Sequence, residues 1–195
     1  MKHLLGLILL VVVIGFTSCE GRTTKRQALL KSIEEFKKTV SFETNVYIPK
    51  TYTEREVDTL MSNGYHVKIK TYSDMANSVL FSKIKDTINQ QIHYRNFNFD
   101  ILVEKEGQLI YEEHYDKLKA NKVLGYSENF HPDSPLYNFD KLAILKSIQV
   151  NEEPSIKNKV LIDIMFAIPE TNRTATHTLY INADGTTHMV HEKIK

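Results

Sequence analysis

The stretch Phe97-Asn98-Phe99-Asp100-Ile101-Leu102-Val103-Glu104-Lys105-Glu106-Gly107-Gln108-Leu109-Ile110-Tyr111 predicts a β-hairpin. Phe97, Phe99, Ile101 and Val103 occupy every second position, as in a strand with one buried face. A two-residue loop would place Val103 opposite Ile110. A three-residue loop with Gly107 in the left-handed conformation places Val103 opposite Leu109 and Ile101 opposite Tyr111. We expect the three-residue loop, because it gathers the apolar side chains on one face.

The same alternation recurs towards the C-terminus. Residues 160–168 alternate strictly up to Pro169, and strands at 174–181 and 187–194 flank a turn at 182–185. Short strands with regular turns predict a mainly β, antiparallel, sandwich-like fold with several hairpins. An α+β fold with an antiparallel sheet is the alternative.

Residues 54–72 allow two interpretations. Asn63-Gly64 is typical of a type I′ hairpin turn, in which both residues have positive φ, and it would pair strands 54–61 and 65–72 with Leu60 facing Val67. The capping pattern Thr53 to Glu56 instead favours a helix that runs into a strand at Tyr65. We expect the hairpin.

The remaining segments are less regular. Residues 27–40 have apolar side chains at helical spacing and predict one short amphipathic helix. Residues 42–48 predict an edge strand before Pro49. Strand character appears near Val79 and Phe81, followed by a loop around 86–90. Residues 115–138 read as a long irregular stretch, which in a compact domain is usually functional or mobile.

The N-terminus carries a secretion signal. A lysine at position 2 precedes an apolar run over 4–16, and small residues lead to Cys19, the single cysteine. The run of about 13 residues is shorter than the roughly 20 that a spanning helix needs. We therefore expect signal residues 1–18, lipidation of Cys19, a tether over 19–26 and a single globular domain over 27–195. Plain secretion with an unmodified cysteine is the alternative.

Composition excludes several classes of partner. The chain has 25 Lys and Arg against 24 Asp and Glu, so it has no electrostatic reason to bind nucleic acid. No glycine pattern of a dinucleotide loop or P-loop is present, and neither is a Gly-x-Ser-x-Gly elbow or a His-Glu-x-x-His motif. We expect no nucleotide, no cofactor and no catalytic residue.

The histidines offer one candidate metal pair. His188 and His191 point to opposite faces of a strand, whereas a three-residue loop in the last hairpin would place His177 opposite His191. Zinc requires three or four ligands, so two histidines alone make an incomplete site, and we expect no metal.

Aromatic residues in the 115–138 stretch are the candidate binding residues. Tyr126, Phe130 and Tyr137 have the side chains that stack on a sugar or a peptide. Aromatic residues are more often buried, so we expect them to plug the core beneath this loop.

The chain resembles uncharacterised small lipoproteins of Bacteroides-type bacteria. The resemblance rests on the lipobox Phe16-Thr17-Ser18-Cys19, the segment 62–70, Phe99-Asp100-Ile101 with Glu106-Gly107, and the segment 181–185. It implies a lipid-anchored, β-rich domain and carries over no catalytic residue. In such bacteria an acidic run directly after the cysteine marks export to the outer face. Cys19-Glu20-Gly21-Arg22 lacks it, which favours an outer-membrane location facing the periplasm.

The leading functional hypothesis is a lipid-anchored, non-enzymatic domain that binds a protein or a glycan of the cell envelope. An immunity or inhibitor protein is one version of it. One alternative is a hydrolase of envelope polymers that uses Asp, Glu or His residues meeting in a cleft. The other is a passive structural lipoprotein, for which only the anchor and the fold matter.

Overall fold

A computed structural model describes residues 24–39, 43–85, 88–152 and 158–194. Contacts between Cα atoms divide the chain into two units. The first comprises residues 1–43 with 84–89, and the second comprises residues 44–83 with 90–195. The signal segment 1–18, Cys19 and most of the tether 19–26 lie outside the described residues.

The first unit contains helix α2, Lys25–Thr39. Thr24 caps this helix reciprocally with Gln27. The backbone N–H of Gln27 donates to Thr24 Oγ1 at 3.2 Å, and the N–H of Thr24 donates to Gln27 Oε1 at 3.0 Å. The expected short helix near the N-terminus is confirmed.

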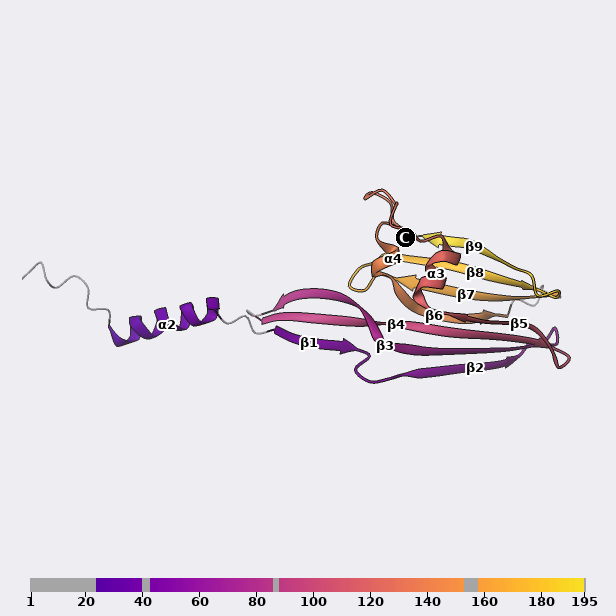
Figure 1. The fold of residues 1–195 in the computed structure, drawn as a ribbon, viewed down its shortest axis with the longest axis horizontal. Coiled ribbons are helices and arrows are strands. Elements are labelled where there is room, and N and C mark those ends of the chain that lie inside the picture. The colour runs from indigo at the N-terminus through magenta and orange to yellow at the C-terminus, as the bar shows by residue number, and fades with distance from the viewer. Residues whose placement is uncertain (1–23, 40–42, 86–87, 153–157, 195) are drawn as a thin grey trace, which may run out of the picture. The chain divides into compact units, whose positions relative to one another are not determined.

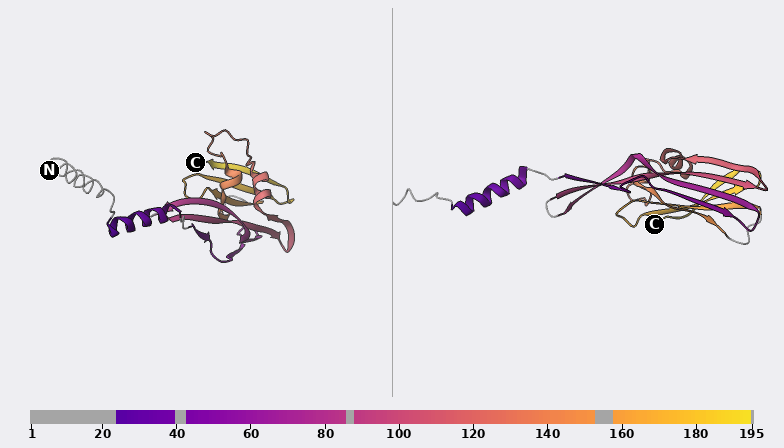
Figure 2. Two further views of the ribbon diagram at one scale, coloured as in Figure 1. Left: turned by 60° about the vertical axis from the view of Figure 1, so that its left-hand side comes forward. Right: turned by 90° about the horizontal axis from the view of Figure 1, so that it is seen from below.

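The second unit contains two antiparallel-rich sheets, shown in Figure 1 and from two further sides in Figure 2. The five-stranded sheet has the order β1-β4-β3-β2, with β5 also pairing with β4. Its strands are β1 Glu43–Ile48, β2 Glu54–Leu60, β3 Tyr65–Lys85, β4 Ile88–Lys105 and β5 Gln108–Tyr115. The four-stranded sheet has the order β6-β7-β8-β9, with strands Ile144–Asn151, Lys159–Ala167, Thr174–Asn182 and Thr187–Ile194. The mainly β, sandwich-like prediction is confirmed.

The core lies between the facing sides of the two sheets. Alternate residues of each strand point into it, as period-two patterning requires. One buried cluster joins residues from both sheets, including Tyr65, Val67, Ile69, Phe99, Ile101, Val103, Val160, Ile162, Ile164, Leu179 and Ile181. The inward faces predicted for 97–103 and 160–168 are therefore the ones observed.

The β4–β5 loop differs from the prediction. Lys105 pairs with Gln108, so the loop has two residues, and both Glu106 (φ 53°) and Gly107 (φ 78°) are left-handed. Such a turn matches the twist of the strands. A bulge between Val103 and Glu104 then places Val103 opposite Tyr111 rather than Leu109, which is exposed. The bulge restores an inward apolar face that the loop alone would have lost.

The β2–β3 hairpin is confirmed, and the helical alternative for 54–61 is wrong. Its register, however, is shifted by one residue, because Leu60 lies opposite His66 and not Val67. Gly64 has a φ of 84°, whereas Asn63 is not among the residues with positive φ, so the turn is not type I′. The wider turn brings Met61 to the core and leaves Leu60 exposed.

Two other segments are more regular than predicted. Strand β3 extends to Lys85 and β4 begins at Ile88, so residues 88–90 of the loop expected over 86–90 are strand, while 86–87 lie outside the described residues. The stretch 115–138 contains helix α3, Lys117–Leu124, which begins at the cap Asp116 and ends at Gly125, and a short helix α4, Phe139–Leu142, follows it. Only Ala120 and Leu124 of α3 are buried, so its apolar pattern is too short to predict a helix.

Candidate functional site

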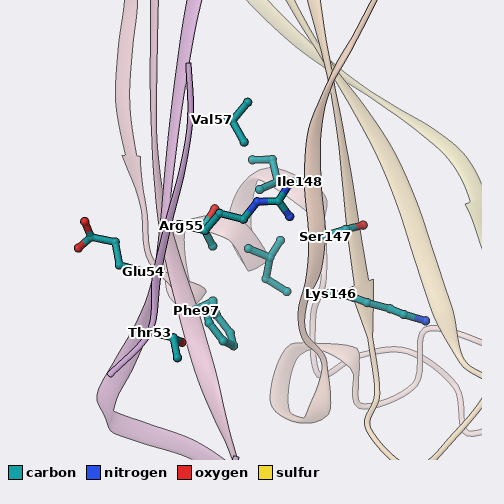
Figure 3. A pocket seen from close by; sticks show the side chains of 10 residues that line it. Thr53, Glu54, Arg55, Val57, Phe97, Lys146, Ser147 and Ile148 are labelled. Carbon is teal, nitrogen blue, oxygen red and sulfur yellow. The ribbon is translucent and has the colours of Figure 1, made fainter. Parts of the chain in front are cut away.

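A groove of about 200 Å³ opens between the edge strands of the two sheets (Figure 3). Strand β2 is the last strand of the five-stranded sheet, and β6 is the first strand of the four-stranded sheet. The backbone of an edge strand presents unpaired N–H and C=O groups. The lining residues are Thr53, Glu54, Arg55, Val57, Thr71, Phe97, Leu145, Lys146, Ser147 and Ile148.

Arg55 occupies an inward position in this groove. On β2 it shares a face with Val57, whose partner Ile69 is in the core. Figure 3 shows its side chain extending from β2 towards Ile148 on β6. The Arg55 side chain is exposed, and within the described part of the chain it has no hydrogen bond and no ion pair. A cation therefore lies unpaired beside apolar side chains.

The other charges in the groove leave it cationic. Glu54 points to the opposite face of β2 in Figure 3 and is neutralised there by Lys70, with Nζ 3.1 Å from its carboxylate. The Tyr52 hydroxyl also donates to it at 2.5 Å. These contacts, led by the Tyr52 hydrogen bond, hold the Glu54 pKa below its usual range. Lys146 is exposed, and Figure 3 shows its side chain extending from β6 away from β2, so Arg55 is the cation that faces the groove.

Tyr126, Phe130 and Tyr137 differ in their burial. Tyr126 is buried with its ring edge towards Phe166, and Phe130 packs against the core. The backbone carbonyl of Tyr137 accepts a hydrogen bond from Arg173 at 2.5 Å. The prediction that these aromatics plug the core is confirmed for Tyr126, which is buried, while Phe130 and Tyr137 are half-buried.

His177 and His191 lie opposite each other on β8 and β9, as predicted, with ring centroids 4.8 Å apart. His177 is fully buried, and its Nε2 lies 2.5 Å from the Tyr126 hydroxyl. Burial, with a smaller contribution from His191, lowers the pKa of His177 to about 4, so the ring is neutral at pH 7. Among the described residues, no group of three or more His, Cys, Asp or Glu side chains could hold a metal ion.

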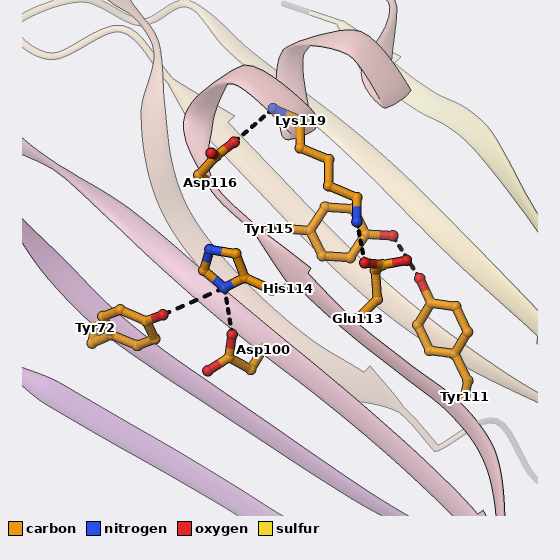
Figure 4. A network of polar contacts seen from close by, with 8 residues as sticks. All are labelled: Tyr72, Asp100, Tyr111, Glu113, His114, Tyr115, Asp116 and Lys119. Atoms are coloured by element: carbon orange, nitrogen blue, oxygen red, sulfur yellow. Dashed lines mark hydrogen bonds and ion pairs between the residues drawn. The ribbon is translucent and has the colours of Figure 1, made fainter.

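Two further histidines lie in carboxylate contacts on the outer face of the five-stranded sheet. His66 Nε2 lies 2.5 Å from Asp58, and its Nδ1 lies 3.2 Å from Glu104. His114 Nδ1 contacts both Asp100 at 2.6 Å and the Tyr72 hydroxyl at 3.4 Å (Figure 4).

Neither arrangement has the geometry of a nucleophile–histidine–carboxylate triad. A triad histidine contacts the nucleophile through one ring nitrogen and the carboxylate through the other. Both nitrogens of His66 face carboxylates, and one nitrogen of His114 faces both of its partners. Figure 4 also shows Lys119 between Glu113 and Asp116, with Tyr111 and Tyr115 in hydroxyl contact at 2.7 Å. Of these contacts, the ion pair between Lys119 and Glu113 links α3 to β5.

The groove was not predicted from the sequence. The one feature of the sequence that points to the groove is Arg55, an arginine on the core-facing side of a charged strand. That side of the strand can be identified only once the β2–β3 register is known. Among the described residues, no helix is both long and apolar enough to span a membrane. A comparison with protein-family models gives no match, and a comparison with curated proteins gives no significant match.

Proposed function

We propose that this chain is a lipid-anchored binding domain of the cell envelope, and that its β2–β6 groove receives an extended, acidic segment of a partner protein. The observation that carries the proposal is the unpaired Arg55 at an inward position of an edge strand. The groove residues all belong to the second unit, so the site is complete within it.

The partner segment is expected to pair with β2 rather than β6. The β2–β3 register runs without a break from Glu54 to Leu60, so β2 presents a regular edge. Strand β6 has a register shift between Leu145 and Ser147, which displaces Lys146 and interrupts its ladder. An added strand makes its main-chain hydrogen bonds with a regular edge, while its alternate side chains enter the groove.

The positive charge of the groove favours a partner segment that carries acidic side chains. Val57, Phe97, Leu145 and Ile148 offer apolar contact, and Arg55 offers positive charge. An inward cation disfavours a purely apolar strand, because the guanidinium would lose water without gaining a partner. A carboxylate on the entering strand removes that cost with a charge-assisted hydrogen bond. Phe97 is the single aromatic residue of this lining, which favours a peptide over a glycan.

The anchor is the second part of the proposal. Cys19 carries the lipid and holds the domain on the outer membrane, facing the periplasm. Acyl chains contribute about 0.8 kcal/mol per buried CH₂, so more than one chain anchors the protein stably without any protein contact. Intact mass of the protein from native membranes tests this directly. The expected result is added lipid mass, which a Cys19→Ala variant lacks. An unmodified, soluble protein would refute the anchor and leave the groove untouched.

The groove is tested with a synthetic peptide that alternates valine and aspartate, compared with the same peptide carrying lysine for aspartate. The expected result is binding of the acidic peptide alone, with NMR amide shifts concentrated in residues 53–57. Arg55→Glu should abolish this binding and favour the lysine peptide. Lys122→Ala, which removes an exposed charge from α3, is the matched control and should bind as the parent protein does.

Two results would refute the groove proposal. One is equal binding of both peptides by the parent protein and by Arg55→Glu. The other is a set of shifts confined to residues outside 53–57 and 145–148. A photo-crosslinking residue at Ser147, in cells, then identifies the natural partner, and Arg55→Glu should remove that crosslink.

A further inference from the structure

Helix α2 has an apolar stripe that remains exposed. Leu29, Ile33 and Phe36 follow one another at helical spacing, and Leu30 lies beside them. Their exposed fractions are 60%, 40%, 58% and 53% in that order. A helix of 15 residues is marginal in water without a surface to pack on. This stripe therefore needs an apolar environment.

The charges of α2 identify that environment. The helix sequence contains Lys25, Arg26, Lys31, Lys37 and Lys38 against Glu34 and Glu35. Arg26 lies four residues before Leu30, and Lys25 lies four before Leu29, so both cations border the apolar stripe. Long cationic side chains in such positions extend their charge towards headgroups while their stems remain in apolar contact.

The first turn of α2 contains no acidic residue. Cations there oppose the helix dipole, which favours negative charge at the N-terminus. Lys25 and Arg26 therefore weaken the isolated helix and become favourable beside an anionic surface. A second copy of the helix would bring the same cations together, so self-association fits this charge pattern less well.

A membrane lies within reach if Cys19 is lipidated. Residues 20–24 separate that cysteine from the start of α2, and even a fully extended chain of this length spans at most about 20 Å. We infer that α2 lies in the plane of the membrane surface, with Leu29, Leu30, Ile33 and Phe36 among the acyl chains and Lys25 and Arg26 at anionic phospholipid headgroups. The inference rests on the proposed membrane location but does not involve the groove.

The test uses the mature chain from residue 19 with Cys19→Ser, so that acylation contributes nothing. The protein has no tryptophan, and Phe36→Trp therefore provides a single fluorescent reporter. Mixed phosphatidylglycerol and phosphatidylethanolamine vesicles should shift its emission to shorter wavelength and make it accessible to brominated lipid. Vesicles of zwitterionic lipid should bind much less.

Variants separate the two contributions. Each cation near an anionic surface changes affinity by about fivefold, so a Lys25→Ala, Arg26→Ala double variant should bind roughly 25-fold more weakly. Ile33→Ser should also weaken binding. Leu118→Ser, which changes an 80% exposed leucine of α3 in the same way, is the matched control and should have no effect.

The alternatives give distinct results. Absence of vesicle binding, or equal binding by every variant, overturns the inference even when native Cys19 carries lipid. Dimerisation in the absence of lipid that Ile33→Ser abolishes would assign the stripe to a second copy and also overturn it. Vesicle binding by α2 with unmodified native Cys19 would instead separate this surface from the proposed anchor.

Discussion

His177 on β8 lies directly opposite His191 on β9, and one ring is fully buried while the other is exposed. The buried ring contacts the Tyr126 hydroxyl through Nε2, and its Nδ1 has no hydrogen-bond partner among the described residues. A neutral imidazole fits this site, since a protonated ring would have to donate from both nitrogens.

Acid should therefore destabilise the fold through His177. Its pKa is about 4 in the folded chain and about 6.5 when unfolded, so the unfolded state binds the extra proton between these values. The free energy of unfolding is therefore unaffected by this group above pH 6.5. It decreases as pH falls towards 4, by up to about 3 kcal/mol. Urea unfolding at several pH values measures the loss. His177→Gln should have a smaller pH dependence, whereas the exposed His188→Gln should keep the parent slope.

His66 should show the opposite behaviour. Hydrogen bonds that the ring donates to Asp58, and then to Glu104, raise the pKa of His66, so the ion pairs form in the folded chain on protonation. Their stabilisation is present below the unfolded pKa and is lost as pH rises through the folded value. An NMR titration should give a midpoint above 6.5, which Asp58→Asn should lower. The exposed Asp133→Asn should leave it unchanged, and a midpoint unaffected by Asp58→Asn would contradict the assignment.

Gly185 should tolerate alanine less well than Gly107. Both have a similar positive φ, 80° and 78°, so backbone strain should lower the free energy of unfolding of both alanine variants by roughly 1 kcal/mol. A Cβ atom at Gly185 would also lie 2.7 Å from the carbonyl oxygen of Ile110, whereas a Cβ atom at Gly107 would have no described atom within 4 Å. We expect a further loss of about 1–2 kcal/mol at Gly185. Equal losses in denaturant unfolding would show that β5 does not restrain this turn.

Arg95 and Arg55 should differ in their contribution to stability. Arg95 is buried, and its guanidinium donates to the carbonyl oxygens of Pro49 at 3.1 Å and Met75 at 2.6 Å. Arg95→Met leaves both carbonyls without this donor and should cost about 2–4 kcal/mol of unfolding free energy. Arg55→Met should change it by less than about 0.5 kcal/mol, because Arg55 has no such contacts. A large loss at Arg55 would assign it a structural role instead of a binding one.

The sequence was sufficient for the elements whose signal is local. Alternation over 97–103 and 160–168 reports which side chains face the core, because successive residues of a strand point to opposite faces. The pairing of His177 with His191 could be predicted from the length of the last loop alone, because the loop length of a hairpin fixes which residues of its two strands lie opposite each other.

Registers near the other turns depended on packing. Glu106-Gly107 adopts the left-handed pair of conformations that the sequence predicts for Asn63-Gly64, and a bulge then places Val103 opposite Tyr111. The turn residues alone decide neither register, because the core selects the one that packs Tyr111 and Met61 against it. Helix α3 was missed for a related reason, since its buried face is two residues long.

The candidate site was decided by tertiary structure. Sequence analysis named Tyr126, Phe130 and Tyr137 as candidate binding residues but expected them to plug the core, and Tyr126 and Phe130 do pack in or against it. The groove instead joins β2 and β6, whose lining residues at 55 and 148 are far apart in the chain. Alternation could place Arg55 on one face of its strand. Only the pairing of the strands and the stacking of the two sheets could show that this face opens beside an unpaired edge.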